Sequence, residues 1–208
     1  MSPTAKKALI TFGIILSVTV MAVMGVMKTR APKAVSGQAW EGTTQDLGDG
    51  PAIGGAFELI DQEGKVRTEK DFLGRTTLVY FGYTFCPDIC PMALGNISEL
   101  LHEVGQDKLN VAFITIDPDR DTVAQLKNYS QNFDPSIVML SGSPEQIKNA
   151  TNVYHVYAAK VKEPGMTDYV MDHSSIIYVM DKDGKYVKSF NHQSSAGEME
   201  AGLKGIIE

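Results

Sequence analysis

Cysteine, tryptophan and clustered positive charge are scarce in this sequence. The 208 residues include two cysteines, Cys86 and Cys90, one tryptophan, Trp40, and a formal net charge of −6. A structural zinc site normally has four ligands, so this cysteine pair would have to recruit Asp88 or water. Neither cysteine lies near the N-terminus, which excludes lipid attachment through cysteine. The acidic balance and the lack of a Lys/Arg cluster after residue 52 argue against nucleic-acid binding, so no nucleic-acid partner is expected.

One long apolar run stands at the start of the chain. The twenty residues 8–27 carry no charge and follow Lys6 and Lys7. A run of about 20 such residues spans a bilayer, whereas the apolar core of a cleaved signal peptide has roughly 7–15. We therefore expect residues 1–28 to form a single, uncleaved N-terminal transmembrane helix, with a cleaved signal peptide as the alternative. Basic residues flank both ends of the run, so the positive-inside rule does not predict its orientation.

The segment that follows, residues 29–52, has the composition of a tether. It contains Pro, Gly, Ser, Thr and Gln without helical or strand periodicity, and Trp40 falls within it. Residues 53–208 are long enough for one globular domain with a sizeable core. The chain is thus expected to consist of an anchor, a tether and one domain that stays soluble without the anchor.

Alternating strand and helix patterns predict an α/β domain. Strands are expected at 57–60, 66–68, 77–83, 110–116, 138–140, 154–160, 175–180 and 186–190, and helices at 92–104, 122–133, 144–153 and from 195 to the C-terminus. The last helix opens with Ser195 and Glu198 at the spacing of a capping box. A sheet that begins β-α-β-α and closes with a hairpin and a helix is a thioredoxin-like fold.

The two cysteines lie at a predicted junction between a strand and a helix. The β-branched and aromatic run 77–83 precedes them, and helical periodicity follows from Met92. Residues i and i+4 share one face of a helical turn with Cβ atoms about 5–6 Å apart, so the sulfur atoms of Cys86 and Cys90 can bind one metal ion or form a reversible disulfide. A pair of inert buried cysteines, or a plain stabilising disulfide, is the structural alternative.

The local electrostatics of this junction act in opposite directions. Free N–H groups at a helix start stabilise thiolates, which are the form of cysteine that binds soft metals and attacks disulfides. Asp88 lies between the cysteines, where its carboxylate can cap the helix but also disfavours a second thiolate until a cation binds. Pro87 and Pro91 stiffen the turn, so the pair is expected to be rigid.

The four histidines are candidates for a third ligand. His102, His155 and His192 are expected on a helix tail, at a helix-to-strand joint and in a polar turn, where a surface role explains each of them. His173 precedes the strand that opens the closing hairpin, and in a thioredoxin-like sheet the loop entering that strand faces the cysteine turn. His173 is therefore the candidate ligand, with Asp172 as a candidate partner that orients its ring.

Two thiolates and one imidazole suit a soft or borderline metal ion in a three-coordinate site. Cu(I) fits this donor set best, and Zn(II) is the rival, although zinc prefers a fourth ligand. Met166 and Met171 lie near His173 in the sequence and offer a thioether, but methionine more often fills gaps in packing.

The chain resembles a known family at three places. These are residues 80–91, YFGYTFCPDICP, residues 117–121, DPDRD, and the pair Asp172-His173. Together they are similar to the motifs of the SCO/SenC family, membrane-anchored, thioredoxin-like copper proteins that help assemble the binuclear copper centre of cytochrome c oxidase. The resemblance covers the chain from about residue 53 to its end and the N-terminal anchor. Phe85 stands where many relatives have histidine, at a position outside the usual ligand set.

This resemblance implies a copper metallochaperone rather than an enzyme. Cys86, Cys90 and His173 take the positions of the family's ligands for Cu(I), with Cu(II) as a further state. The implied partners are the copper-bearing subunit of cytochrome c oxidase and a second protein that donates copper. A short N-terminus without an amphipathic leader favours a bacterial inner (cytoplasmic) membrane with the domain facing the periplasm.

A thiol-disulfide reductase that keeps the acceptor's cysteines reduced is the alternative function. It would need only Cys86 and Cys90, whose spacing is one residue longer than the C-x-x-C of redox thioredoxins.

The acidic segment 117–121 is expected to have a local structural role. Pro118 would end the preceding strand, Asp119 or Asp121 would cap the next helix, and Arg120 would pair with either aspartate. A docking surface for a partner is the alternative.

Overall fold

The computed structural model describes residues 52–162 and 164–207. The predicted anchor, residues 1–28, and all but the last residue of the predicted tether, residues 29–52, lie outside the described residues, as does Trp40. Within the described ranges, no helix is both long enough and apolar enough to cross a membrane.

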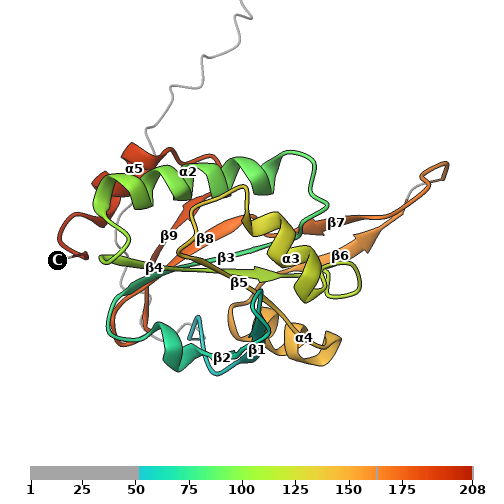
Figure 1. Cartoon of the computed structure of the whole chain (residues 1–208), viewed down its shortest axis with the longest axis horizontal. Helices are drawn as coiled ribbons and strands as arrows, with labels where there is room; N and C mark the ends of the chain where they lie inside the picture. Colours follow the sequence, from blue (N-terminus) through green and yellow to red (C-terminus); the bar gives the residue numbers. More distant parts are fainter. Residues whose placement is uncertain (1–51, 163, 208) are drawn as a thin grey trace, which may run out of the picture. The chain divides into compact units, whose positions relative to one another are not determined.

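A seven-stranded sheet forms the centre of the domain (Figure 1). Its strand order is β2-β1-β5-β4-β3-β8-β9, in which β3, β4 and β5 are parallel and all other pairings are antiparallel. The strands are β1 Glu58–Asp61, β2 Val66–Thr68, β3 Thr76–Gly82, β4 Leu109–Thr115, β5 Ile137–Ser141, β8 Ile176–Met180 and β9 Tyr186–Asn191. The predicted hairpins at both ends of the domain are confirmed.

Helices cover both faces of this sheet. In Figure 1, α2 and α5 lie together on one face, and α4 lies on the other. The helices are α2 Ile89–Val104, α3 Val123–Ser130, α4 Pro144–Val153 and α5 Ala196–Leu203, and a short 3-10 turn, η1, spans Glu69–Phe72. The capping box predicted at Ser195 is present, but α5 ends at Leu203 rather than at the C-terminus. The predicted order of β-α-β-α followed by a hairpin and a helix is confirmed.

Packing of α2 on the sheet decides how the two cysteines are buried. Every residue of β3 is buried, as expected for a central strand covered on both faces. The side chains of α2 that face the sheet recur at intervals of three and four residues, which is the pattern of an amphipathic helix. They are Cys90, Ala93, Leu94, Ile97, Leu100 and Leu101. Cys90 is the first residue of this apolar stripe and is buried by the helix, whereas Cys86 precedes α2 and stays partly exposed.

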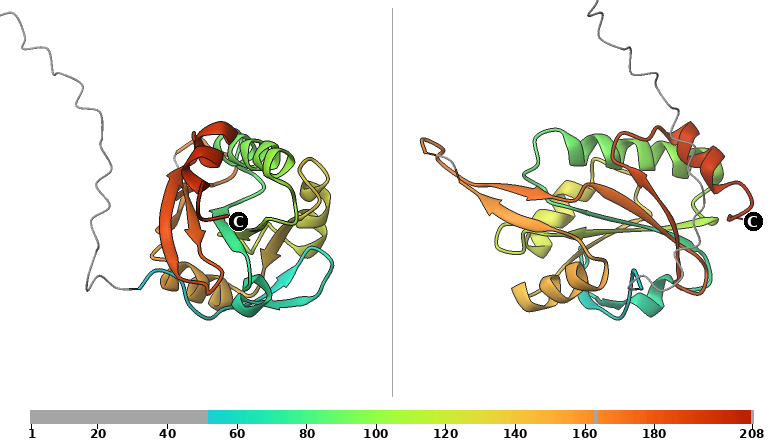
Figure 2. Two further views of the ribbon diagram at one scale, coloured as in Figure 1. Left: turned by 90° about the vertical axis from the view of Figure 1, so that its left-hand side faces the viewer. Right: turned by 180° about the vertical axis from the view of Figure 1, so that it is seen from behind.

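A separate two-stranded ribbon was not predicted. Strands β6 (Ala158–Val161) and β7 (Val170–His173) pair antiparallel, with Ala158 opposite His173, and form their own sheet. Figure 2 shows this ribbon extending from one end of the seven-stranded sheet. His173 was expected in a loop, but it is the last residue of β7.

Candidate metal centre

Cys86 precedes the first turn of α2, and Cys90 lies within that turn. The backbone N–H of Cys90 donates a hydrogen bond to the sulfur of Cys86 over 3.4 Å, so this sulfur lies at the N-terminal end of the helix. Asp88 occupies the N-cap position, but its side chain makes no capping hydrogen bond. The N–H groups that Asp88 was expected to satisfy are instead directed toward the Cys86 sulfur.

The two thiols differ in acidity. The Cys90 thiol donates to Cys86, and the N–H groups of Cys90, Asp88 and Ile89 add to this, so the pKa of Cys86 falls to about 5 although partial burial opposes the change. The same hydrogen bond, together with burial, raises the pKa of Cys90 well above its usual range. At neutral pH the pair therefore holds one thiolate, Cys86, and one thiol, Cys90.

Two residues of β3 shape the space around the Cys90 sulfur. The hydroxyl of Tyr80 donates to this sulfur over 3.7 Å. A Cβ atom at Gly82 would lie 2.8 Å from the same sulfur and 2.8 Å from Phe113, so only glycine leaves room for both. Tyr80 and Gly82 are two positions apart in one strand and face the same side of the sheet. Sequence reasoning assigned neither residue to the site, although this alternation was a signal that pointed to them.

His173 reaches the cysteines from the end of β7. Its Nε2 lies 4.0 Å from the Cys90 sulfur, and its Nδ1 lies 3.1 Å from the carbonyl oxygen of Ser174. Burial lowers the pKa of His173, outweighing the Ser174 carbonyl and the nearby Cys86 thiolate, so the ring is neutral at pH 7. When Nδ1–H donates to Ser174, the lone pair of Nε2 faces Cys90.

Ser174, rather than Asp172, orients the histidine ring. The ring also meets the Tyr83 ring edge-on, with 5.9 Å between centroids. Asp172 precedes His173 in an extended strand, where successive side chains point to opposite faces, so the expected contact between these neighbours is not favoured by the backbone. His102 and His155 are exposed, as predicted for surface histidines.

A pocket of about 330 Å³ opens between the cysteine turn and β7. Cys86 and His173 line it together with Met171, and Ile89 and Val170 add apolar surface. The structure thus gathers Cys86, Cys90 and His173 from two distant parts of the chain. Across residues 52–162 and 164–207, however, no three His, Cys, Asp or Glu side chains are grouped closely enough to enclose a metal ion. Cys86, Cys90 and His173 therefore lie near one another but do not form a closed coordination site.

The acidic segment 117–121 differs from its predicted role. Thr122 caps α3 in place of Asp119 or Asp121, and its hydroxyl accepts a hydrogen bond from Gln125 N–H. Arg120 pairs with neither of these aspartates but with Asp117, over 2.5 Å. Capping by residue 122 leaves the carboxylates of the segment available for contacts elsewhere in the fold.

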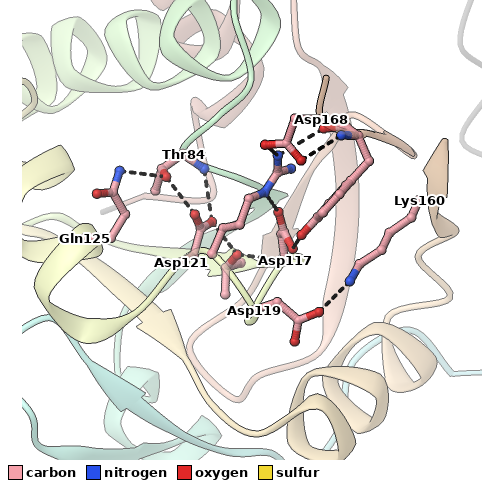
Figure 3. Close-up of polar contacts among 10 residues, drawn as sticks. Thr84, Asp117, Asp119, Asp121, Gln125, Lys160 and Asp168 are labelled. Carbon is pink, nitrogen blue, oxygen red and sulfur yellow. Dashed lines mark hydrogen bonds and ion pairs between the residues drawn. The ribbon is translucent and has the colours of Figure 1, made fainter. Parts of the chain in front are cut away.

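Asp121 connects this segment to the loop before Cys86. Its buried carboxylate accepts hydrogen bonds from the N–H and the hydroxyl of Thr84, over 3.0 and 2.6 Å. It also accepts one from the Thr115 hydroxyl over 2.6 Å. Figure 3 shows Asp121 between Thr84 and the rest of the acidic segment. The conformation of the cysteine loop therefore depends on a carboxylate 35 positions after Cys86 in the sequence.

Comparison with known proteins gives a consistent result. A family model described as SCO1/SenC matches residues 45–208. The SCO2-like protein of Rickettsia typhi is 40% identical over 192 residues, which cover 89% of this chain and 93% of that protein.

Solved structures are also similar to this chain. Bradyrhizobium japonicum ScoI with copper bound is 48% identical, covers 75% of this chain and 100% of its own, and superimposes with a TM-score of 0.69. Arabidopsis thaliana ScoI with copper bound is 39% identical, covers 73% and 96%, and gives a TM-score of 0.67. The predicted α/β, thioredoxin-like fold of residues 53–208 agrees with these structures. The chain belongs to the SCO1/SenC family.

Proposed function

We propose that this protein binds copper through Cys86, Cys90 and His173 and delivers it to the copper-bearing subunit of cytochrome c oxidase, for the binuclear copper centre. Membership of the SCO1/SenC family supports the proposal, as does copper in the two ScoI structures. Copper is here the cargo of a binding protein that has no turnover of its own. A separate copper donor protein would load the site.

The geometry that carries the proposal is the approach of His173 to the cysteine pair. A first-row metal ion bonds thiolate sulfur at about 2.3 Å and imidazole nitrogen at about 2.0 Å, so one ion spans the two atoms up to about 4.3 Å apart. The separation of 4.0 Å between Cys90 Sγ and His173 Nε2 lies within this limit. The donor set of two sulfurs and one neutral imidazole suits Cu(I), and the imidazole extends it to Cu(II).

Binding would complete a site that is partly formed. Cys86 is already a thiolate, whereas Cys90 must lose its proton, and a cation between the sulfurs offsets the repulsion that opposes this loss. Ile89 and Val170 add apolar surface to the pocket, and Val170 is 38% exposed. Asp88 lines the same pocket and is exposed, and we do not assign it as a fourth ligand.

We further propose that residues 1–28 anchor the domain in the inner membrane, facing the periplasm. The apolar run 8–27 and the flanking basic residues support this arrangement. Release of the full chain from washed membranes by high salt, without detergent, would contradict it.

A thiol-disulfide reductase is the second candidate, and one observation favours it. A partly exposed, acidic Cys86 beside a buried, protonated Cys90 is the arrangement in which one thiolate attacks a disulfide and the second thiol resolves the mixed disulfide. The acceptor's cysteines would be the substrate. This activity requires both cysteines but no histidine.

His173→Ala separates the two candidates. The variant should keep Cu(I) bound between two sulfurs and should reduce a model disulfide at nearly the wild-type rate, while Cu(II) binding and oxidase assembly fail. Titration of the purified full chain with copper measures Cu(I) and Cu(II) binding, and oxidase activity in cells that carry only the variant measures oxidase assembly. Normal Cu(II) binding together with full oxidase assembly would remove His173 from the site and favour the reductase.

The oxidation state of the cysteines gives an independent test. A Cys86–Cys90 disulfide removes both thiolates, so copper uptake should be lost and should return after reduction. Metal analysis of the reduced and oxidised protein checks this expectation. Equal copper stoichiometry in both states would exclude the cysteines as ligands.

A further inference from the structure

The ribbon that carries His173 is not part of the sheet that carries the cysteine loop. Strands β6 and β7 pair only with each other within the described ranges, 52–162 and 164–207. The chain joins β7 to β8 through Ser174 and Ser175, which fixes the end of β7 but not its direction. The position of the His173 side chain beside Cys90 therefore depends on contacts that the ribbon makes outside its own sheet: Met171 is buried, Lys160 of β6 pairs with Asp119, and the residues just before β7 contact Arg120.

Arg120 makes the contacts nearest the beginning of β7. Its Nη1 donates to the carbonyl oxygen of Tyr169 over 3.0 Å and to the carboxylate of Asp168 over 3.2 Å, immediately before β7. Its guanidinium also stacks on the Tyr169 ring at 3.7 Å from the centroid. Figure 3 shows Asp168 and Asp117 close together in this region.

Asp117 bridges Arg120 and Tyr169 through two hydrogen bonds. One carboxylate oxygen accepts the Nε–H of Arg120 over 2.5 Å, and the other accepts the hydroxyl of Tyr169 over 2.7 Å. The side chain of Asp117 has no exposed surface, and that of Arg120 is 15% exposed. Charged hydrogen bonds shielded from water in this way are stronger and more directional than surface ion pairs. We refer to Arg120, Asp117 and Tyr169 as the latch.

Arg120 touches the cysteine loop as well as the ribbon. Its guanidinium lies 4.8 Å from the centroid of the Phe85 ring and 5.8 Å from that of Tyr83. Phe85 directly precedes Cys86, and Tyr83 packs against the His173 ring. One planar cation thus contacts the elements that carry both halves of the proposed copper site, through stacking that lysine cannot reproduce.

We propose that Arg120 is a positioning residue that holds β7 against the cysteine loop and so sets His173 within reach of a metal ion bound by the cysteines. This inference rests on the proposed function, because it takes His173 as the third copper ligand. Arg120 acts through His173 and touches no copper itself. Without the latch, β7 moves away from the cysteine loop, while the cysteine turn, fixed separately by Asp121 and α2, keeps its shape.

Arg120→Lys is the informative variant, because it keeps a cation beside the buried Asp117 carboxylate and removes the fork and the planar stack. Arg120→Ala would leave that carboxylate buried and unpaired, which destabilises the whole fold. Arg75→Lys is the matched control. Arg75 is exposed, and its Nη1 donates to the Asp107 carbonyl oxygen over 3.1 Å, away from the ribbon.

The experiment compares wild type, His173→Ala, Arg120→Lys, the double variant and Arg75→Lys as full-length, reduced protein in detergent. Cu(II) binding is followed by thiolate-to-copper absorption and by nitrogen hyperfine splitting in electron paramagnetic resonance. We expect Arg120→Lys to weaken Cu(II) binding about 10–100-fold, as is usual when a residue that orients a ligand is lost, and to weaken the nitrogen hyperfine splitting that His173 contributes. Cu(I) binding and alkylation of Cys86 should stay within about threefold of wild type. Arg75→Lys should match wild type.

The double variant decides whether Arg120 acts through His173. If it does, adding Arg120→Lys to His173→Ala, in which Cu(II) binding has already failed, leaves the Cu(I) affinity and the alkylation rate of Cys86 unchanged. A fall in Cu(I) affinity in that background, or a wild-type Cu(II) spectrum and affinity for Arg120→Lys, would overturn the proposal. Unchanged Cu(II) binding in His173→Ala would instead refute the proposed copper ligands. Tyr169→Phe, which keeps the ring but removes the bond to Asp117, should shift Cu(II) binding in the same direction and serves if Arg120→Lys does not fold.

Discussion

The pH at which Cys86 ionises tests the electrostatics of the cysteine turn directly. Its pKa of about 5, against an ordinary value of 9.0, makes it about 99% thiolate at pH 7, where an ordinary cysteine is about 1% thiolate. The gain in thiolate population is thus about 100-fold. Intrinsic nucleophilicity falls with pKa by a factor of about 40–100 over the same interval, so the alkylation rate at pH 7 is nearly that of the unfolded chain.

The pH profile, rather than the rate at one pH, is therefore the measurement. In the folded, reduced protein, alkylation of Cys86 should be flat from pH 9 to 6 and fall to half at about pH 5. In urea the rate should fall about tenfold for each pH unit below 9. Cys90 is buried and protonated, so it should stay unmodified until the protein unfolds. Alkylation with iodoacetamide for fixed times, followed by mass spectrometry of peptides, measures the two cysteines separately.

Substitution of Cys90 identifies the cause. The hydrogen bond from the Cys90 thiol is the largest contribution to the low pKa of Cys86, so Cys90→Ala should raise the midpoint of the profile. Cys90→Ser keeps a donor and should keep the midpoint low. A native midpoint near 9, or an identical midpoint in both variants, would refute this account.

The same shift predicts a dependence of stability on pH. A lowered pKa in the folded state contributes stability that is fully present above the unfolded pKa, near 9, and is lost as the pH falls through about 5. The difference in Tm between the reduced wild type and Cys86→Ser should therefore grow as the pH rises from 5 to 9. Calorimetry that finds this difference constant over that window would contradict the lowered pKa.

Three substitutions around the site test its packing and hydrogen bonds. Tyr80→Phe removes the donor to the Cys90 sulfur and should lower the free energy of unfolding by about 0.5–1.5 kcal/mol in urea titrations, and no loss would show that the bond is not formed. Gly82→Ala places a Cβ 2.8 Å from that sulfur, so it should lower the free energy of unfolding by about 1–3 kcal/mol and weaken Cu(I) binding. Gly95→Ala is the control: its Cβ meets no atom within 4 Å, so it should lower neither the free energy of unfolding nor the Cu(I) affinity. Asp121→Ala leaves the Thr84 and Thr115 donors without an acceptor and should cost about 3 kcal/mol or more, so that a loss below about 1 kcal/mol would contradict a central role for this carboxylate.

Local patterns predicted most of the central sheet and its helices. Helix α4 has the predicted bounds, Pro144–Val153, because Pro144 follows the N-cap Ser143 and Gln146 completes a capping box. The strand before the cysteines was predicted from its run of β-branched and aromatic residues. Every residue of this strand, β3, is buried in the structure. These features depend on residues close together in the sequence, so the sequence alone determines them.

The ribbon and the latch depend on long-range contacts and were missed. Part of β6 falls within the strand expected at 154–160, but β7 has only four residues and no distinctive pattern, so the pairing of the two strands was not predicted. Arg120 was expected to pair with Asp119 or Asp121, its nearest acidic neighbours, but it reaches Asp168, which is 48 positions away. The expected place of His173 before the closing hairpin and the resemblance to the SCO/SenC family both pointed to this residue, yet nothing in the residue spacing showed that it lies on a second sheet.

The acidity of the cysteine pair does not by itself distinguish copper delivery from disulfide reduction, because one thiolate beside one thiol serves both. The place of His173 bears on the choice between them. Disulfide exchange uses the two cysteines, and an imidazole 4.0 Å from the Cys90 sulfur could take part only as a base for the proton of the resolving thiol. A Cu(II) ion would instead bind that imidazole directly, so its binding would depend on the contacts of Asp117 with Arg120 and Tyr169 that hold the ribbon. Loss of Cu(II) binding in Arg120→Lys with unchanged reduction of a model disulfide would therefore support both the copper site and the positioning role of Arg120.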